Sequence, residues 1–288
     1  MELLVQQLFN GLATGGAYCL AAIGLTLVFG VLKIPNLAHG SLYMLGAYLT
    51  FFFMTSVGVH YVLAIICAAI VMGLVGVVLE RIVFHPLRDS PHTHHMIAAA
   101  GAMFFFTALV QQVWGNDFHR VDSPLTGRLT ILEAQVTWQR IVVVLVAVVV
   151  MIILTWFIKK TAAGQSIEAI EQDRIGASLV GINPNRVSMM TFALAGVLVA
   201  IAGGLMAPVS SISPFMGETI MVKVFAIIIL GGLGSIPGAI IGGFGLGVAE
   251  ALSTTYISAA AGEVTAFVLL VVVLAVKPTG LFSHKGAR

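Results

Sequence analysis

Residue types that usually carry chemistry are scarce in this chain, since 59% of its 288 residues are hydrophobic and only 9% are charged. The sequence contains no phosphate-binding loop of the form G-x-x-x-x-G-K-[ST], no H-E-x-x-H zinc motif and no G-x-S-x-G nucleophile motif. We therefore expect that the chain is not an enzyme and does not hydrolyse ATP itself. The polar groups that remain are concentrated in a few short segments.

One acidic residue, Glu250, lies deep within an apolar run. A carboxylate inside a membrane is costly and is by default a candidate functional group. The sequence suggests no basic partner for it in a neighbouring run, and a single acid is too little for a proton relay. Glu250 is therefore either a residue of a solute path or part of a structural hydrogen-bond network.

A second polar segment, KIPNLAHGSLYMLGAY, follows the first apolar run. Pro35 should break the helix there, and polar groups at membrane depth are tolerated only within protein or beside a water-filled cavity. The segment could therefore line a path for a polar solute, and the alternative is a solvated turn. The candidate path residues are Asn36, His39, Ser41 and Tyr43, together with Glu250.

Glycines interrupt the apolar sequence FAIIILGGLGSIPGAIIGG. Pro237 suits the first turn of a new helix, and glycine allows one backbone to pass close to another. The break either exposes helix ends to a solute or forms a compact turn. The candidate helix-break residues are Gly231, Gly232, Gly234 and Gly238.

Four histidines follow the third apolar run, namely His85, His92, His94 and His95. The segment contains prolines but no cysteine, so we expect a solvated loop and no metal site. The two cysteines of the chain, Cys19 and Cys67, both lie in apolar segments and are expected to serve as small packing residues.

The most polar segment on the inner side covers residues 159–186 and lies between two long apolar runs. Residues 167–180 are long enough for one short helix, which Gly181 would close. Its charges fit a solvated face, and Ile170, Ile175 and Leu179 could enter a groove in a partner. The segment is therefore either a docking helix or an ordinary loop. The candidate docking residues are Ile167, Glu168, Ile170, Glu171, Asp173, Arg174 and Gly181.

These segments are embedded in nine apolar runs, and a helix needs about 20 apolar residues to cross a bilayer. Eight runs approach that length, and residues 220–230 are too short to span alone, so they predict a half-helix or a re-entrant element. The runs cover residues 3–31, 40–57, 61–84, 95–114, 138–158, 187–207, 220–230, 237–255 and 263–282. The fold class is an all-α polytopic membrane protein of eight to nine membrane elements.

Lysine and arginine in the loops indicate the orientation, because they concentrate on the cytoplasmic side. If each run crosses once, the inner side carries Lys33, Arg81, Arg88, Lys159, Lys160, Arg174, Arg186, Lys277, Lys285 and Arg288. The outer side carries Arg120, Arg128, Arg140 and Lys223. This distribution places the N-terminus outside, and the alternative, a re-entrant element at residues 220–230, would put both termini on the same side.

Residues 115–137, on the outer side, alternate apolar and polar side chains near Leu129 and should form a small cap or hairpin. No low-complexity linker divides the chain, so we expect one domain over residues 1–288. Pairs of glycines at helical spacing, such as Gly11 and Gly15 or Gly243 and Gly247, predict close helix packing.

Four motifs in order resemble one known family: NLAHGSLYMLGAY, GQSIEAIEQDRIGASLVGIN, ILGGLGSIPGAIIGG and KPTGLF. The chain resembles permease subunits of ABC importers for branched-chain and other hydrophobic amino acids, and is most like the shorter, first-type permease. Two positions depart from the family pattern. Glu168 stands where a basic residue is common, and Ser41 stands where an acid is common.

The resemblance implies a bacterial inner-membrane protein that moves small amino acids inward by alternating access. Its implied partners are a second, related permease, two cytoplasmic ATPases that bind ATP and magnesium, and an extracytoplasmic solute-binding protein. This chain itself would hold no cofactor, and its middle loop would dock on an ATPase. The alternative from another class is a stand-alone secondary transporter or channel for a small polar solute.

Overall fold

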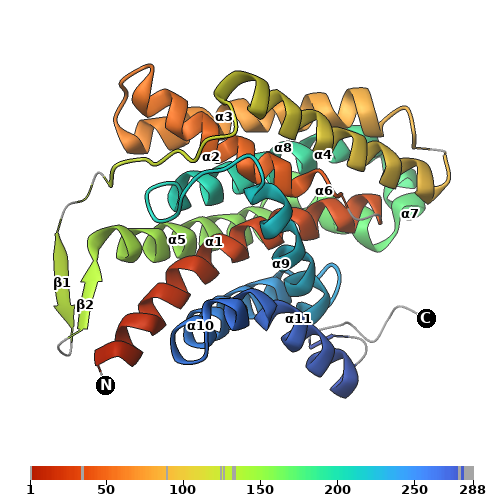
Figure 1. Ribbon diagram of the computed structural model, residues 1–288. Coiled ribbons are helices and arrows are strands. Elements are labelled where there is room, and N and C mark those ends of the chain that lie inside the picture. The colour runs from red at the N-terminus through yellow and green to blue at the C-terminus, as the bar shows by residue number, and fades with distance from the viewer. Residues whose placement is uncertain are drawn as a thin grey trace.

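The computed structural model describes residues 2–33, 36–88, 90–123, 125, 127–131, 134–277 and 280–281. Their helices form one bundle with a small β-hairpin at one end (Figure 1). Pro35, Lys285 and Arg288, and part of the KPTGLF motif, lie outside the described residues. The helices are α1 (Glu2–Leu32), α2 (His39–Thr55), α3 (Tyr61–Leu79) with its π-helical extension η1 (Glu80–Phe84), α4 (His92–Trp114), α5 (Trp138–Lys160), α6 (Ala162–Gln172), α7 (Arg174–Leu179), α8 (Pro184–Met206), α9 (Met216–Gly231), α10 (Ile236–Tyr256) and α11 (Ala259–Val276).

Within the described residues, seven helices are long and apolar enough to cross a membrane. They are α1, α3 with η1, α4, α5, α8, α10 and α11. Helices α2 and α9 match two further predicted runs but contain only 17 and 16 residues. The prediction of an all-α polytopic membrane protein is confirmed.

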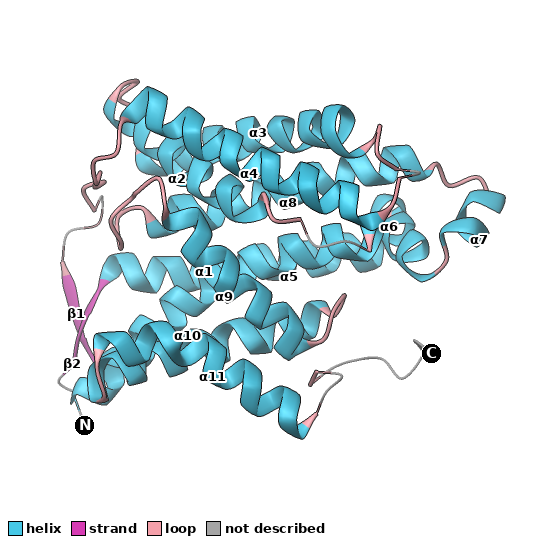
Figure 2. Ribbon diagram, turned by 45° about the vertical axis from the view of Figure 1, so that its right-hand side comes forward, coloured by secondary structure: helices cyan, strands magenta, loops and turns pink. Residues whose placement is uncertain are grey.

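The bundle has two ends, which we call the hairpin end and the loop end. Strands β1 (Arg128–Ile131) and β2 (Ala134–Thr137) lie at the hairpin end near the N-terminus, while α6 and α7 lie at the loop end (Figure 2). The strands pair antiparallel, with Leu129 opposite Val136. The predicted hairpin in residues 115–137 is therefore confirmed.

The chain crosses the bundle between residues 212 and 234, although α9 itself begins inside the bundle, where Gly217 packs against Gly40. Before α9, Ile212 pairs with His119, which follows α4 at the hairpin end. After it, the turn at Gly234 lies beside Glu171 of α6 at the loop end. The N–H of Leu281 donates to the carbonyl of Leu230 at 2.8 Å, so residues 280–281 also lie at the loop end, opposite the start of α1.

Helix α1 is the most central element and packs most extensively against α10 (Figure 1). Its 31 residues make it about 46 Å long, more than the roughly 30 Å of a bilayer core. The contact runs through the predicted glycine pairs. A Cβ on Gly247 would lie 2.5 Å from the carbonyl oxygen of Gly11 and 2.5 Å from the Cα of Gly15. The two backbones touch because side chains are absent there, as helix association in lipid requires.

Candidate functional site

The predicted path residues at the start of α2 are buried well inside the bundle. His39 lies 2.8 Å, through Nε2, from the carbonyl of Ala21, about 16 Å along α1 from its end at Leu32. Asn36 is 1% exposed, and its Oδ1 accepts a hydrogen bond from the N–H of Ala38 at 3.1 Å. The chain therefore reaches membrane depth before α2 begins, as the sequence predicts.

Ser41 and Tyr43 are the other two candidates of this segment. The Ser41 hydroxyl donates to the carbonyl of Met103 in α4 at 3.3 Å. Tyr43 is 4% exposed. Ser41 thus contacts α4, whereas His39 contacts α1.

Glu250 has a basic partner, contrary to the sequence analysis. The Nζ of Lys223 lies 2.5 Å from Oε1 of Glu250 and donates to the hydroxyl of Tyr18 at 2.9 Å. The Tyr18 hydroxyl in turn donates to Oε2 of Glu250 at 3.0 Å. These three residues, which we call the charge triad, join the interiors of α9, α10 and α1.

The position of Lys223 also corrects the predicted distribution of charge. Lys223 is the eighth residue of the 16-residue helix α9, so it lies inside the bundle and not in an outer loop. The error came from assigning a single lysine to a loop although the sequence around it is apolar. One lysine in a short apolar run and one acid in the next is the signal that could have predicted the pair.

A second buried acid, Glu80, was missed in the sequence. It begins η1 and is 1% exposed, and its Oε2 has no hydrogen-bond partner among the described residues. π-Helical turns occur often at functional sites. The histidine segment also differs from the prediction, because His92 already begins α4.

The middle segment, residues 159–186, forms two helices and not one. Asp173 separates α6 from α7, and its Oδ1 accepts hydrogen bonds from the N–H groups of Ile175 (2.9 Å) and Gly176 (3.0 Å). This N-cap starts a new helix and resets the periodicity. If residues 167–180 formed one helix, their apolar side chains would not fall on one face. Two helices, each with its own start, remove this difficulty.

The two helices have different roles in packing. Ile167 and Ile170 are 1% and 3% exposed, so α6 is anchored in the bundle and Ile170 does not face a partner. By contrast, Ile175, Leu179 and Val180 are 75%, 84% and 77% exposed. We call these three residues the α7 apolar patch. The charged residues Glu168, Asp173 and Arg174 are exposed.

Gly181 ends this pair of helices as predicted. Its φ of +90° is a conformation that favours glycine, and a Cβ there would meet no atom within 4 Å. Asn183 then caps α8, with its Oδ1 accepting from the N–H of Asn185 at 2.9 Å.

The helix-break glycines form a compact turn between α9 and α10. Gly231 and Gly238 lie back to back, with no room for a side chain on either. Gly232 and Gly234 have φ values of +96° and +85°. Ser235 then caps α10, its hydroxyl accepting from the N–H of Gly238 at 3.1 Å.

The carboxylate of Glu171 packs against this turn. A Cβ on Gly234 would lie 2.8 Å from its Oε1, and a Cβ on Gly30 of α1 would lie 2.8 Å from its Cδ. Lys33 also donates through Nζ to the carbonyl of Glu171 at 2.9 Å. Helix α6 is thereby connected to the end of α1 and to the turn that begins α10.

A family comparison decides what kind of protein carries these features. The sequence model described as "Branched-chain amino acid transport system / permease component" matches residues 7–276. This chain belongs to that permease family. The resemblance found in the four motifs is confirmed.

Individual relatives cover nearly the whole permease. The high-affinity branched-chain amino acid transport system permease protein LivH of Salmonella typhimurium is 36% identical, over 97% of this chain and 96% of that protein. The corresponding protein BraD of Pseudomonas aeruginosa is 34% identical over the same shares. Among solved structures, PsaBC from Streptococcus pneumoniae in complex with Fab has a TM-score of 0.52 and 13% identity, covering 97% of this chain and 93% of that one. The last comparison shows a similar fold alone.

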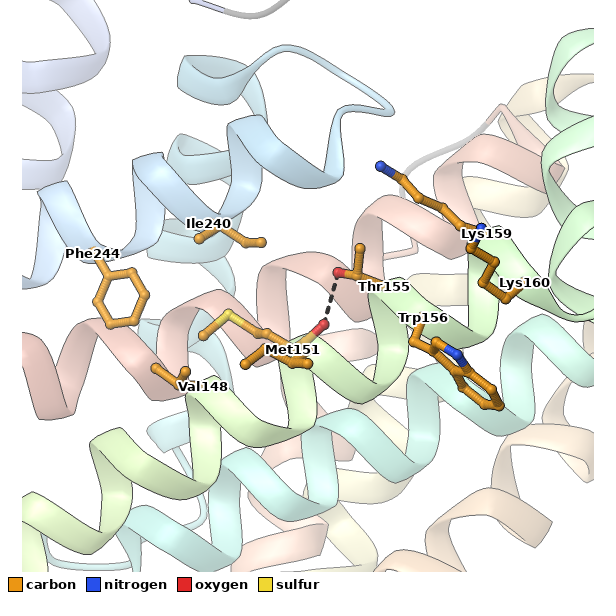
Figure 3. Close-up of a pocket in the computed structure, with 9 residues that line it drawn as sticks. Val148, Met151, Thr155, Trp156, Lys159, Lys160, Ile240 and Phe244 are labelled. Atoms are coloured by element: carbon orange, nitrogen blue, oxygen red, sulfur yellow. Dashed lines mark hydrogen bonds between the residues drawn. The ribbon is translucent and has the colours of Figure 1, made fainter.

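The permease also has an apolar groove of about 500 Å³ between α5 and α10 (Figure 3). Val148 and Met151 of α5 face Ile240 and Phe244 of α10 across it. Its Thr155 hydroxyl already donates to the carbonyl of Met151 at 2.8 Å. Lys159 and Lys160 also line the groove, but no acidic residue does, so the groove offers cations and no anion to a solute. The charge triad is not part of its lining, and it is the better candidate for a solute contact.

Proposed function

We propose that this permease is the membrane subunit of an ABC importer that moves branched-chain or other small amino acids inward. The match to the permease family over residues 7–276 carries this proposal. The relatives named above are described as parts of branched-chain amino acid transport systems, which supports the substrate class. The proposed site of action is the plasma membrane of a bacterium.

Such an importer requires partners that this chain lacks. We propose a second, related permease, two cytoplasmic ATPases and an extracytoplasmic solute-binding protein. The ATPases would bind ATP and magnesium, and this chain would hold no cofactor. The predicted excess of lysine and arginine at the loop end supports a cytoplasmic position for α6 and α7.

The α7 apolar patch is the surface proposed to dock on an ATPase. Ile175, Leu179 and Val180 project from a short helix whose neighbours Asp173 and Arg174 are charged and exposed. Exposed apolar side chains at a polar loop favour a protein partner that covers them. Helix α6 holds the patch in place because Ile167 and Ile170 are buried in the bundle.

The contacts of Glu171 suggest how motion of an ATPase would reach the membrane. A shift of α6 would act through the Glu171 carboxylate on the turn at Gly234, which joins α9 to α10. These two helices carry Lys223 and Glu250. Rigid helices moving as bodies between two states are an established way to change access to a site.

We expect that the double substitution Ile175→Ser and Leu179→Ser reduces ATPase association without unfolding the chain. Both side chains are exposed, so their loss removes partner contact and little internal packing. The measurement is a detergent pull-down of the tagged chain with quantification of the bound ATPase. These substitutions are preferable to deleting residues 167–180, because that deletion would also remove the buried Ile167 and Ile170.

Val57→Ser is the matched control, since Val57 is 54% exposed in the connection between α2 and α3. It should leave ATPase association unchanged. Full association of the double variant would contradict the docking role of the α7 apolar patch.

A further inference from the structure

The charge triad contains the one ion pair between side chains that lies inside the described part of the bundle. Lys223 and Glu250 are 13% and 19% exposed, and each lies within the interior of its helix. An ion pair removed from water is weak evidence for stability, because well-packed apolar side chains of similar size serve as well or better. Ionisable residues within a membrane protein are therefore candidates for a functional site.

The chemistry of the triad is complementary to a zwitterion. The ammonium of Lys223 has three N–H donors, and two of them bind Oε1 of Glu250 and the Tyr18 hydroxyl. The Glu250 carboxylate only accepts, whereas the Tyr18 hydroxyl both accepts from Lys223 and donates to Glu250. If the pair separates, it presents one cation and one anion on adjacent helices.

We propose that Lys223, Glu250 and Tyr18 form a subsite for an amino-acid zwitterion, in which the solute takes the place of each partner. The solute carboxylate binds Lys223, and the solute ammonium binds Glu250. One ion pair is exchanged for two, so no charge is left unpaired in either state. This proposal rests on the proposed function and identifies residues that would carry it out.

A solute with one charge does not fit this exchange. An amine without a carboxylate leaves Lys223 without an anionic partner, and a carboxylate without an amine leaves Glu250 without a cationic one. A buried polar group that loses its partner discriminates strongly against the wrong solute. The subsite therefore selects for the two charges that all α-amino acids share, and not for the side chain.

The architecture also allows the pair to open. Lys223 and Glu250 lie on α9 and α10, which are joined by the turn at Gly234 that contacts Glu171. Movement of α6 would therefore shift the turn that joins α9 and α10, the two helices that carry the opposite charges. Tyr18 lies on α1, which packs against α10 through closely spaced glycines. This contact holds Tyr18 in place beside Glu250.

The decisive experiment compares single and double neutralisation in the complete importer. The purified complex is reconstituted in proteoliposomes, and ATP-driven uptake of labelled leucine is measured with Lys223→Met, Glu250→Gln and the double variant. The single variants leave one buried charge unpaired, so they should lower both assembly and uptake. The double variant removes both charges, so it should restore assembly and ATP hydrolysis while uptake stays at least roughly tenfold below wild type.

Wild-type uptake in the double variant would overturn the subsite and leave the triad a structural pair, while the proposed function would stand. A wild-type complex that moves no amino acid would overturn the proposed function itself, and the subsite with it. The two failures are therefore distinguishable.

A second measurement uses only wild-type subunits and so does not depend on the folding of variants. Binding of labelled leucine is measured on the complex without its solute-binding protein, with leucinamide and 4-methylpentanoate as competitors. Each competitor lacks one of the two charges and should compete at least roughly tenfold more weakly than unlabelled leucine. Equal competition by either one, or no saturable binding of leucine, would overturn the subsite.

Discussion

Gly247→Val is expected to destabilise the permease by opening the contact between α1 and α10. The new Cβ would lie 2.5 Å from backbone atoms of both Gly11 and Gly15, and backbone cannot move aside as a side chain can. Helices α1 and α10 would have to separate along the most extensive contact in the bundle. Overpacking of this kind costs about 1–3 kcal/mol, so the melting temperature in detergent should fall by roughly 2–12 °C. Fluorescence-detected gel filtration after heating measures this shift.

Gly245→Val is the matched control because it makes the same chemical change two residues away. A Cβ on Gly245 would meet no atom within 4 Å, so the helix propensity and the side-chain volume change equally while the packing does not. We expect its melting temperature to remain close to that of the wild type. Equal losses in the two variants would mean that valine weakens α10 itself and that the glycine contact is not what holds α1.

The sequence predicts most of the fold because the bilayer imposes a simple rule on it. A crossing helix must be long and apolar, so the spans are visible in the sequence as apolar runs. Glycines at helix contacts are visible as pairs four residues apart, such as Gly11 with Gly15 and Gly243 with Gly247. The hairpin follows from alternation near Leu129. These features depend on local sequence, which explains why they could be predicted without knowing which helices are neighbours.

The charge triad could not be predicted in the same way because it depends on which helices meet. Lys223 and Glu250 are 27 residues apart, and Tyr18 lies 205 residues from Lys223. Only the turn at Gly234, which brings α9 back against α10, makes the ion pair possible. Sequence reasoning that counted charges by loop assigned Lys223 to the outer side.

The middle segment was divided incorrectly for a local reason. Asp173 was counted as a solvated charge of one helix. However, aspartate is a typical N-cap, whose side chain accepts a hydrogen bond from the N–H two residues later, here that of Ile175. Once the helix is divided there, Ile170 falls on the buried face of α6 while Leu179 falls in the exposed patch on α7.

Gly234→Ala is expected to uncouple ATP hydrolysis from uptake. Alanine disfavours the φ of +85° by roughly 1–2 kcal/mol, and its Cβ would lie 2.8 Å from Oε1 of Glu171. The turn and α6 could then no longer keep their present contact. Uptake per ATP hydrolysed in proteoliposomes should fall roughly tenfold, since about 1.4 kcal/mol corresponds to that factor. The chain itself should remain in the membrane, because the change lies at a surface turn.

A double-mutant cycle with Glu171→Ala separates the lost contact from backbone strain. If both substitutions act by breaking the contact between Glu171 and Gly234, the double variant should be no worse than the more impaired single variant. Gly58→Ala controls for strain alone, since Gly58 has a φ of +76° with no atom within 4 Å of a Cβ, in the connection between α2 and α3. Its uptake per ATP should stay near the wild-type value. Additive losses in the cycle, or equal loss from Gly58→Ala, would exclude Glu171 as the connection between α6 and the helices that hold Lys223 and Glu250.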